Sequence, residues 1–216
     1  MTATGGLPGP QGTPEEIARF VIGAAVWAPS VHNTQPWRFA VRPGEISLYA
    51  DPDRWLAVAD PAGREMLISC GAALFNARLA LRYLGWVPAT AYPAVPDVTD
   101  LAFPGRDFAQ GRGWGTASAQ PAPLMRPAGT PGLLTTPGDE PADWVSAGQA
   151  LQRLLLDASS SGIAVALHTQ PLELPELRKL VRVQLAGGSY PQMIVRLGRT
   201  SQTASSVRRP VRDVLL

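Results

Sequence analysis

The sequence predicts an α+β domain, because helical and strand-like patterns alternate along one chain of 216 residues. Apolar residues recur at helical spacing in four long segments, and short alternating or continuous apolar runs lie between them. Such an alternation is typical of helices packed around a mixed sheet. A chain of this length can form one core without a disulfide or structural metal. We therefore expect a single domain over residues 13–198.

The first helix is predicted by a start signal. Residues 1–12 are small, polar or helix-breaking and are expected to form a disordered tail. Thr13-Pro14-Glu15-Glu16 then places a threonine at the N-cap, a proline at the first helical position and a glutamate at the third, which forms a capping box. The helix is expected to run to about Trp27, because the residue before Pro29 disfavours helical backbone.

A hairpin and a long helix follow. Alternating residues over 37–41 and 46–50, joined by Pro43-Gly44, predict the hairpin. The helix is expected to begin at Asp60-Pro61 and to end at Gly85. Its apolar residues form two stripes, so it is expected to be buried on both sides, either across the core or in a subunit interface. The stripes are Leu67, Cys70, Leu74, Leu81 and Leu84, and Ile68, Ala72, Phe75 and Leu79.

The second half begins with an irregular segment. Residues 86–132 are rich in proline and glycine and lack periodicity, so we interpret them as an insert, either a mobile lid or the trace of a lost segment. Regular elements then resume, and residues 199–216 are expected to form an extended C-terminal arm. The expected elements are a strand at 133–136, a helix at 139–161, a buried strand at 163–167, a helix containing Leu177, Leu180, Val181 and Leu185, and a strand at 191–197.

Composition excludes several classes of site. Cys70 is the only cysteine, which excludes a disulfide framework and a multi-cysteine metal centre. With only two histidines, His32 and His168, no metal site is expected. The net charge of +2 is too small to drive nucleic-acid binding. The longest apolar run, about ten residues, is half of what a membrane helix needs. We expect a cytoplasmic protein that binds neither membrane nor nucleic acid.

The most informative segment lies between the first helix and the hairpin. Ala28-Pro29-Ser30-Val31-His32-Asn33-Thr34-Gln35-Pro36-Trp37 combines a hydroxyl, an imidazole, two amides and a large aromatic side chain. Uncharged donors and acceptors in a proline-restricted loop suit a neutral planar ligand better than a phosphate or a metal. The alternative is a structural turn in which Asn33 and Gln35 satisfy backbone groups.

This segment resembles the Ala-Pro-Ser-x-x-Asn-x-Gln-Pro-Trp signature of the nitroreductase-like flavoproteins. Other stretches resemble the Acg-type subgroup, in which two nitroreductase halves are fused in one chain. A portion of such proteins is missing here between about Tyr92 and Arg106, so the chain looks like the front of the first half joined to the back of the second. The Acg-like stretches lie at residues 48–54, 59–61, 69–74, 106–109, 135–139, 147–151, 170–173 and 208–211.

The resemblance implies a nitroreductase-like fold with FMN at a subunit boundary in a homodimer. It also implies hydride transfer from NAD(P)H through the flavin to a nitroaromatic, quinone or similar acceptor. The alternatives are an Acg-type protein that binds or stores flavin without turnover, and a remnant that binds nothing. No side chain is assigned as catalytic, because the cofactor supplies the chemistry.

The resemblance also implies cofactor contacts, in three groups. The first approaches the isoalloxazine from the partner chain, the second lies near flavin N5, and the third holds the phosphate. They are Pro29, Ser30, His32, Asn33 and Gln35; His168, Thr169 and Gln170; and Arg208 and Arg209. The N-terminal arginine-serine-arginine signature that holds the phosphate in typical members is absent, and only Arg19 lies in the first helix. FMN is therefore expected to bind less tightly here.

Other features have plain structural explanations. His32 and His168 also fit hydrogen-bonded structural roles. Cys70 is expected to be inert in the core. The glycine-rich run at 111–115 has no strand before it and no helix after it, so it is not expected to bind phosphate. The arginine-rich tail lacks the interleaved aromatic residues of a nucleic-acid site.

Overall fold

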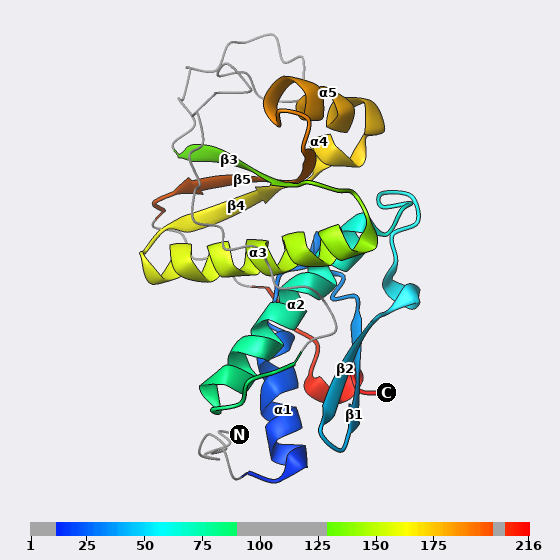
Figure 1. Cartoon of the computed structure of the whole chain (residues 1–216), viewed down its shortest axis with the longest axis vertical. Helices are drawn as coiled ribbons and strands as arrows, with labels where there is room; N and C mark the ends of the chain where they lie inside the picture. The colour runs from blue at the N-terminus through cyan, green and yellow to red at the C-terminus, as the bar shows by residue number, and fades with distance from the viewer. Residues whose placement is uncertain (1–11, 90–128, 201–205) are drawn as a thin grey trace. The chain divides into compact units, whose positions relative to one another are not determined.

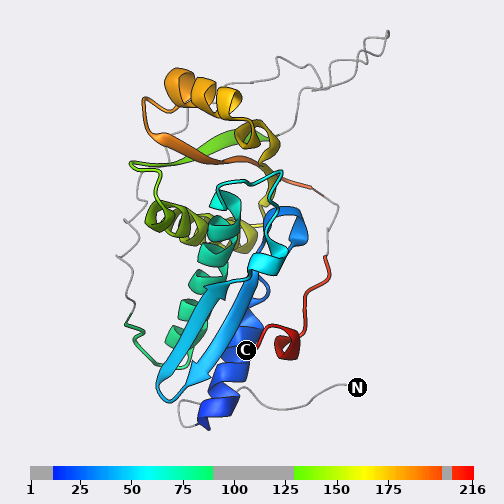
Figure 2. The same cartoon turned by 90° about the vertical axis from the view of Figure 1, so that its right-hand side faces the viewer.

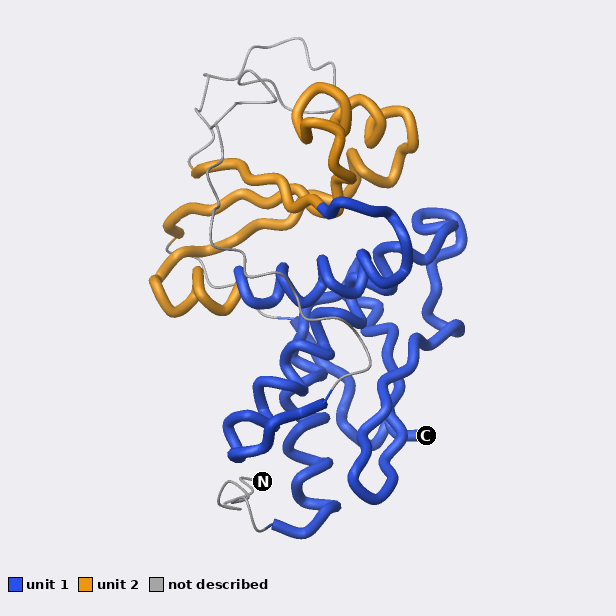
Figure 3. The backbone as a smooth tube through the Cα atoms, viewed as in Figure 1, with its two compact units in different colours: residues 1–97, 136–154, 204–216 blue, residues 98–135, 155–203 orange. Residues whose placement is uncertain are grey.

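The computed structural model describes residues 12–89, 129–200 and 206–216. The chain divides into two compact units (Figure 3): unit 1 comprises residues 1–97, 136–154 and 204–216, and unit 2 comprises 98–135 and 155–203. The α+β class is confirmed, and the described strands form one sheet of two strands and one of three. The predicted tail, most of the insert, the glycine-rich run and the junction near 92–106 lie outside the described residues. The predicted domain boundaries stay a prediction.

Helix α1 (Pro14–Ala25) begins as its start signal predicts (Figure 1). The Thr13 side chain accepts from the Glu16 amide N–H at 3.3 Å, and the Glu16 carboxylate accepts from the Thr13 amide N–H at 2.9 Å. The Thr13 amide N–H and the Thr13 hydroxyl both donate to the Glu16 carboxylate, and these two hydrogen bonds lower the pKa of Glu16 by stabilising its charged form. The buried residues of α1 pack against the hairpin and the next helix, which places α1 on the core of unit 1.

The predicted hairpin is confirmed as strands β1 (Trp37–Arg42) and β2 (Glu45–Ala50), which are antiparallel with Trp37 opposite Ala50. Trp37 and Phe39 are fully buried in the core of unit 1. The C-terminal segment, including the short helix η3 (Val211–Asp213), runs beside β1 (Figures 1 and 2). There the Phe39 amide N–H donates to the Val214 carbonyl at 2.7 Å, and the Leu216 N–H donates to the Phe39 carbonyl at 2.9 Å. A parallel bridge therefore joins Leu215 to the outer edge of the hairpin.

Helix α2 (Arg64–Tyr83) begins later than Asp60 because a turn precedes it. The Gly63 N–H donates to the Asp60 carbonyl at 2.9 Å, and the Asp60 carboxylate accepts from the Met66 N–H at 2.9 Å. Asp60 thus satisfies a free amide of the first turn from outside the helix. One face of α2 packs on α1, and the other meets the first part of α3 (Pro141–Ser160). Helix α2 therefore packs on both sides, as predicted, but Leu79 of the second predicted stripe is 46% exposed. The alternative of a subunit interface stays a prediction.

Unit 2 contains a three-stranded sheet of order β3-β5-β4 and two short helices. Strands β4 and β5 are antiparallel, with His168 opposite Ile194. The predicted strand at 163–167 exists, but the prediction that it is buried is wrong, because most residues of β4 are exposed at the end of the sheet. The apolar run of β4 resembles that of a buried strand, and a residue pattern alone cannot distinguish a central strand from an edge strand. The bounds in this unit are β3 (Thr130–Thr136), β4 (Ala164–His168), α4 (Gln170–Glu173), α5 (Pro175–Leu185) and β5 (Tyr190–Gly198).

Within the described ranges, no helix has the length and hydrophobicity that a bilayer crossing requires.

Candidate functional site

The loop of residues 29–36, between α1 and β1, has an unusual backbone for its residue types. It includes the short helix η1 (Val31–Asn33). His32, Asn33 and Gln35 have positive φ angles of 46°, 56° and 51°. Non-glycine residues rarely adopt this left-handed conformation, because Cβ comes too close to the backbone. Such residues persist where the surrounding structure holds them, and they cluster at functional sites. The 29–36 loop is therefore the first candidate for a binding site.

Hydrogen bonds inside the 29–36 loop determine its turn. The Gln35 amide N–H donates to Ser30 Oγ at 2.9 Å, and the Thr34 amide N–H donates to the Val31 carbonyl at 2.9 Å. The Val31 amide N–H donates to Ser69 Oγ on α2 at 3.2 Å. The Ser30 hydroxyl therefore supports the loop backbone, and Ser69 fixes the loop to the helix behind it.

The C-terminal segment lies directly against the 29–36 loop. The side-chain amides of Asn33 and Gln35 donate to the Val207 carbonyl at 3.1 and 3.2 Å. The Arg209 amide N–H donates to Gln35 Oε1 at 2.6 Å, and its guanidinium donates to the Gln35 carbonyl at 3.1 Å. The Arg208 guanidinium donates to Asn33 Oδ1 at 3.3 Å. The structure thus brings together two groups of predicted contacts that lie more than 170 residues apart in the sequence.

The two amides match the alternative interpretation of the loop, because both bind main-chain groups. Gln35 is 5% exposed, and both ends of its side-chain amide bind residues of the C-terminal segment. His32 and Asn33 are exposed, and Pro29 and Ser30 are half-buried. Gln35 therefore shapes the site, while the exposed residues of the loop can reach a ligand.

Arg208 and Arg209 differ in their electrostatic partners. Arg209 Nη1 lies 3.6 Å from the carboxylate of Asp51, and the side chain of Arg209 is 14% exposed. Arg208 has no carboxylate within ion-pair distance among the described residues, and its Nε is buried without a hydrogen-bond partner. Its other guanidinium contacts are neutral, including the Trp27 carbonyl at 3.3 Å. Burial lowers the pKa of Arg208, because its charge has lost water. An anion that bound there would offset this cost.

His168, Thr169 and Gln170 lie in unit 2, at the end of β4 and the start of α4. The Thr169 hydroxyl donates to Glu173 Oε1 at 3.2 Å, which ties it to the next helical turn. Their role near a flavin stays a prediction.

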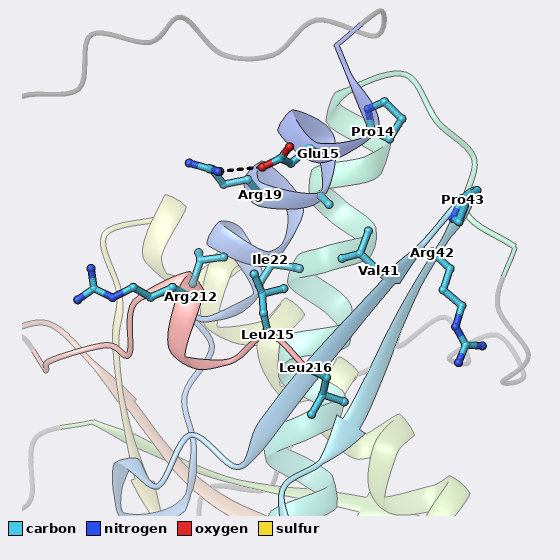
Figure 4. A pocket seen from close by; sticks show the side chains of 12 residues that line it. Pro14, Glu15, Arg19, Ile22, Val41, Arg42, Pro43, Arg212, Leu215 and Leu216 are labelled. Atoms are coloured by element: carbon cyan, nitrogen blue, oxygen red, sulfur yellow. Dashed lines mark hydrogen bonds and ion pairs between the residues drawn. The ribbon is translucent and has the colours of Figure 1, made fainter.

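Unit 1 also has an open groove of about 590 Å³ between α1, the end of β1 and the C-terminal residues (Figure 4). Ile22, Val41 and Leu215 line it, and Arg19 pairs with Glu15 at 3.2 Å at its edge. None of the predicted cofactor contacts lines this groove. Arg19 is thus engaged with a carboxylate away from the 29–36 loop.

Cys70 is buried in the core of unit 1, as predicted, and its thiol donates to the Pro36 carbonyl at 3.2 Å. Burial and the nearby charge of Asp51 raise the pKa of the thiol to about 12. The thiol is therefore protonated at neutral pH, which agrees with an inert role. In the part of the chain that the structure describes, no three His, Cys, Asp or Glu side chains gather as a metal site.

Sequence analysis did not single out the carboxylate behind the loop. The side chain of Asp51, at the end of β2, is 1% exposed and lies within ion-pair distance of Arg38, Arg54 and Arg209. The available signal was an aspartate directly after the predicted strand at 46–50. Arg54 lies three residues after Asp51, but Arg38 and Arg209 come from other segments, so local spacing could not predict the whole cluster.

Comparison with known proteins places the chain among homologues from Mycobacterium tuberculosis. No family model matches it. It is 28% identical over 293 residues to a protein provisionally named NAD(P)H nitroreductase Rv3131 of strain H37Rv, with 85% of each chain covered. It is 39% identical over 70 residues to the provisionally named NAD(P)H nitroreductase acg, which covers 32% of this chain and 21% of acg. A third relative, the uncharacterized protein Rv3127, is 40% identical over 63 residues, which covers 27% of this chain and 18% of the relative.

These matches confirm the predicted resemblance to nitroreductase-like proteins, including acg. The alignment with Rv3131 spans more positions than this chain has residues, so that relative contains an internal segment without a counterpart here. This agrees with the expectation that part of the longer chain is missing.

Proposed function

Because two of its homologues are provisionally named NAD(P)H nitroreductases, we propose that this chain is an FMN-dependent oxidoreductase of the nitroreductase-like kind. When bound, FMN would take a hydride from NAD(P)H and pass reducing equivalents to a nitroaromatic, quinone or similar acceptor. The observation that carries the proposal is the position of Arg208 beside the 29–36 loop, with no carboxylate partner among the described residues.

The chemistry of Arg208 fits the phosphate of FMN. A half-buried guanidinium whose partners among the described residues are all neutral can bind a dianion with charge-assisted hydrogen bonds. Arg209 is less suited to this role, because Asp51 already balances part of its charge. In the proposal, Arg208 binds the phosphate and Arg209 holds the segment that presents Arg208.

The 29–36 loop supplies the neutral part of the proposed site. His32 and Asn33 are exposed and can contact the isoalloxazine, together with the half-buried Pro29 and Ser30. Gln35 supports these residues, since its side-chain amide binds the C-terminal segment. No side chain here needs to act as an acid or base.

The proposal includes a cytoplasmic homodimer in which each flavin lies at the subunit boundary. His168, Thr169 and Gln170 would contact the ring near N5. Light scattering of the purified protein tests the dimer, and a concentration-independent monomer would contradict it.

A flavin-binding protein without turnover is the second candidate. Asp51 already balances part of the charge of Arg209, so Arg208 is the one predicted phosphate ligand without a carboxylate partner among the described residues. A phosphate held mainly by one arginine supports weaker cofactor retention than in typical members. The two candidates share the binding site and differ in whether NAD(P)H reduces the bound flavin.

Titration with FMN and with riboflavin tests the site. The protein should bind FMN, and Arg208→Met should raise the Kd for FMN by about 10- to 100-fold, because a hydrogen bond to a charged group contributes roughly 1.5–3 kcal/mol. Riboflavin lacks the phosphate, so its Kd should not change. Arg212→Met is the matched control, since Arg212 lies in the same segment and its side chain is 86% exposed.

Two results would contradict the proposal. Absence of FMN binding at high micromolar concentration would exclude both flavin functions. Equal weakening of FMN and riboflavin by Arg208→Met would remove the phosphate role. Stopped-flow bleaching of the bound flavin by NADH or NADPH then separates an oxidoreductase from a storage protein.

A further inference from the structure

Asp51 directly follows the last residue of β2 and lies next to the end of the 29–36 loop. Its amide N–H donates to the Pro36 carbonyl at 3.0 Å, which fixes its backbone to the end of the loop. Its side chain is 1% exposed. A carboxylate removed from water to this extent needs positive charge nearby.

Three guanidinium groups supply that charge. Arg38 Nε, Arg209 Nη1 and Arg54 Nε lie 3.0, 3.6 and 3.8 Å from Asp51 Oδ2. None of them has the alignment of a hydrogen bond with the carboxylate, so the attraction is between charges. Arg38 also pairs with the exposed Asp53, at 3.4 Å. Without Asp51, three positive groups would lie close together, with Asp53 near Arg38 and Asp213 near Arg209 left to balance them.

Two of these three arginines bind the 29–36 loop directly. Arg54 Nη1 donates to the Thr34 carbonyl at 2.9 Å, and Arg209 Nη1 donates to the Gln35 carbonyl at 3.1 Å. These consecutive carbonyls lie in the stretch where His32, Asn33 and Gln35 have positive φ. The two arginines therefore hold the part of the loop whose backbone needs the most support.

We propose that Asp51 is a positioning residue for the 29–36 loop and for the segment that presents Arg208. It gathers Arg54 and Arg209 on one side of the loop, and these hold the Thr34 and Gln35 carbonyls. Its effect on flavin binding rests on the proposed function, whereas its effect on the loop does not.

Hydrogen exchange of the ligand-free protein, read by NMR, tests the effect on the loop. Asp51→Asn keeps the shape of the side chain and removes its charge. The amides of Asn33, Thr34 and Gln35 should then exchange at least about tenfold faster, while amides in the middle of α1 and α2 keep their rates. Asp53→Asn is the matched control, because it removes the same charge from an exposed residue whose one ion-pair partner among the described residues is Arg38. It should change loop exchange less than about twofold.

Equal exchange rates in Asp51→Asn and the unmodified protein would overturn the proposal, as would equal effects of Asp51→Asn and Asp53→Asn. If Asp51→Asn does not fold, Arg54→Gln decides, because the Arg54 side chain is 40% exposed and its loss leaves Asp51 paired. This variant should speed exchange at Thr34 and Gln35 by about three- to tenfold, and no change there would overturn the proposal.

FMN binding provides a readout that general destabilisation would not move. If Asp51 acts on the segment of Arg208, then Asp51→Asn combined with Arg208→Met should raise the FMN Kd by less than the product of the two single effects. A simple product would contradict positioning through that segment. If the unmodified protein binds no FMN, the proposed function fails, and the exchange experiment still tests the loop.

Discussion

Two places in unit 1 bring segments of main chain close together, and they do so by different means. Where α2 crosses α3, two glycines allow contact: a Cβ at Gly148 would lie 1.9 Å from the Ile68 carbonyl oxygen, and one at Gly71 would lie 2.2 Å from that of Val145. At the 29–36 loop, polar and charged side chains hold the backbone in place. The crossing depends on shape, and the loop depends on hydrogen bonds and charge.

The difference separates a structural element from a candidate site. At the crossing, the backbone is helical and the missing side chains allow close packing, so the arrangement serves stability. At the loop, left-handed residues and a half-buried arginine cost free energy that a ligand-free fold would not require. We therefore expect substitutions at the crossing to change stability most, and substitutions around the loop to change binding or local order.

Gly148→Ala should have the largest effect. The new methyl group would overlap the Ile68 carbonyl, which cannot move without shifting α2, so the free energy of unfolding should fall by about 3 kcal/mol or more. Urea denaturation measures this. Gly23→Ala on α1 is the control, because the nearest atom to its new Cβ is 4.0 Å away and alanine favours helix by up to about 1 kcal/mol. Similar losses in both variants would contradict the role of the crossing.

Arg209→Met should have the second-largest effect on the free energy of unfolding. It removes one partner of a buried carboxylate and the donor to the Gln35 carbonyl, so unfolding should cost about 1–3 kcal/mol less. Thermal and urea denaturation both measure this loss. Arg212→Met should change stability by less than about 0.5 kcal/mol, because its pair with Asp213 is exposed. An effect of Arg212→Met as large as that of Arg209→Met would remove the distinction between the two arginines.

Cys70 connects the two regions, since it lies on α2 and its thiol binds the Pro36 carbonyl. Its pKa rises from 9.0 to about 12 on folding. The stability that it contributes is present below pH 9 and is lost as pH rises toward 12, with a slope of up to about 1.4 kcal/mol per pH unit. The difference between the unmodified protein and Cys70→Ala, measured by urea denaturation from pH 8 to 10.5, should show this slope. A difference that does not change with pH would contradict the raised pKa.

Asn33 should show the smallest effect. Asn33→Ala and Asn33→Gly both remove the side-chain contacts with Val207 and Arg208, but glycine adopts the positive φ of 56° without strain. The glycine variant should therefore be the more stable of the two by about 1 kcal/mol, as measured by urea denaturation. If the alanine variant is as stable, the loop does not keep its left-handed backbone in solution.

The sequence predicted the parts of the fold that depend on neighbouring residues. The capping box of Thr13 and Glu16 and the turn at Pro43-Gly44 are local signals, and both are found in the structure. The start of α2 was misplaced, because Asp60 caps the helix from outside it. The burial of β4 was mispredicted, because a strand pattern does not specify where in a sheet the strand lies.

The candidate site was predicted in part. The residue types of the 29–36 loop and the resemblance identified Asn33, Gln35, Arg208 and Arg209, which lie together in the structure. The different proposed roles of Arg208 and Arg209 were not predictable, because they depend on which of the two arginines pairs with Asp51. The positive φ angles were not predictable either, since they result from contacts with segments far along the chain.

The bridge at Leu215 has a consequence for handling this protein. A hairpin offers two rows of backbone donors and acceptors, and the row on β1 would be free to pair with a strand of another molecule. Residues 214–216 occupy that row through the two hydrogen bonds of Phe39. A chain shortened before Val214 should therefore aggregate through β1.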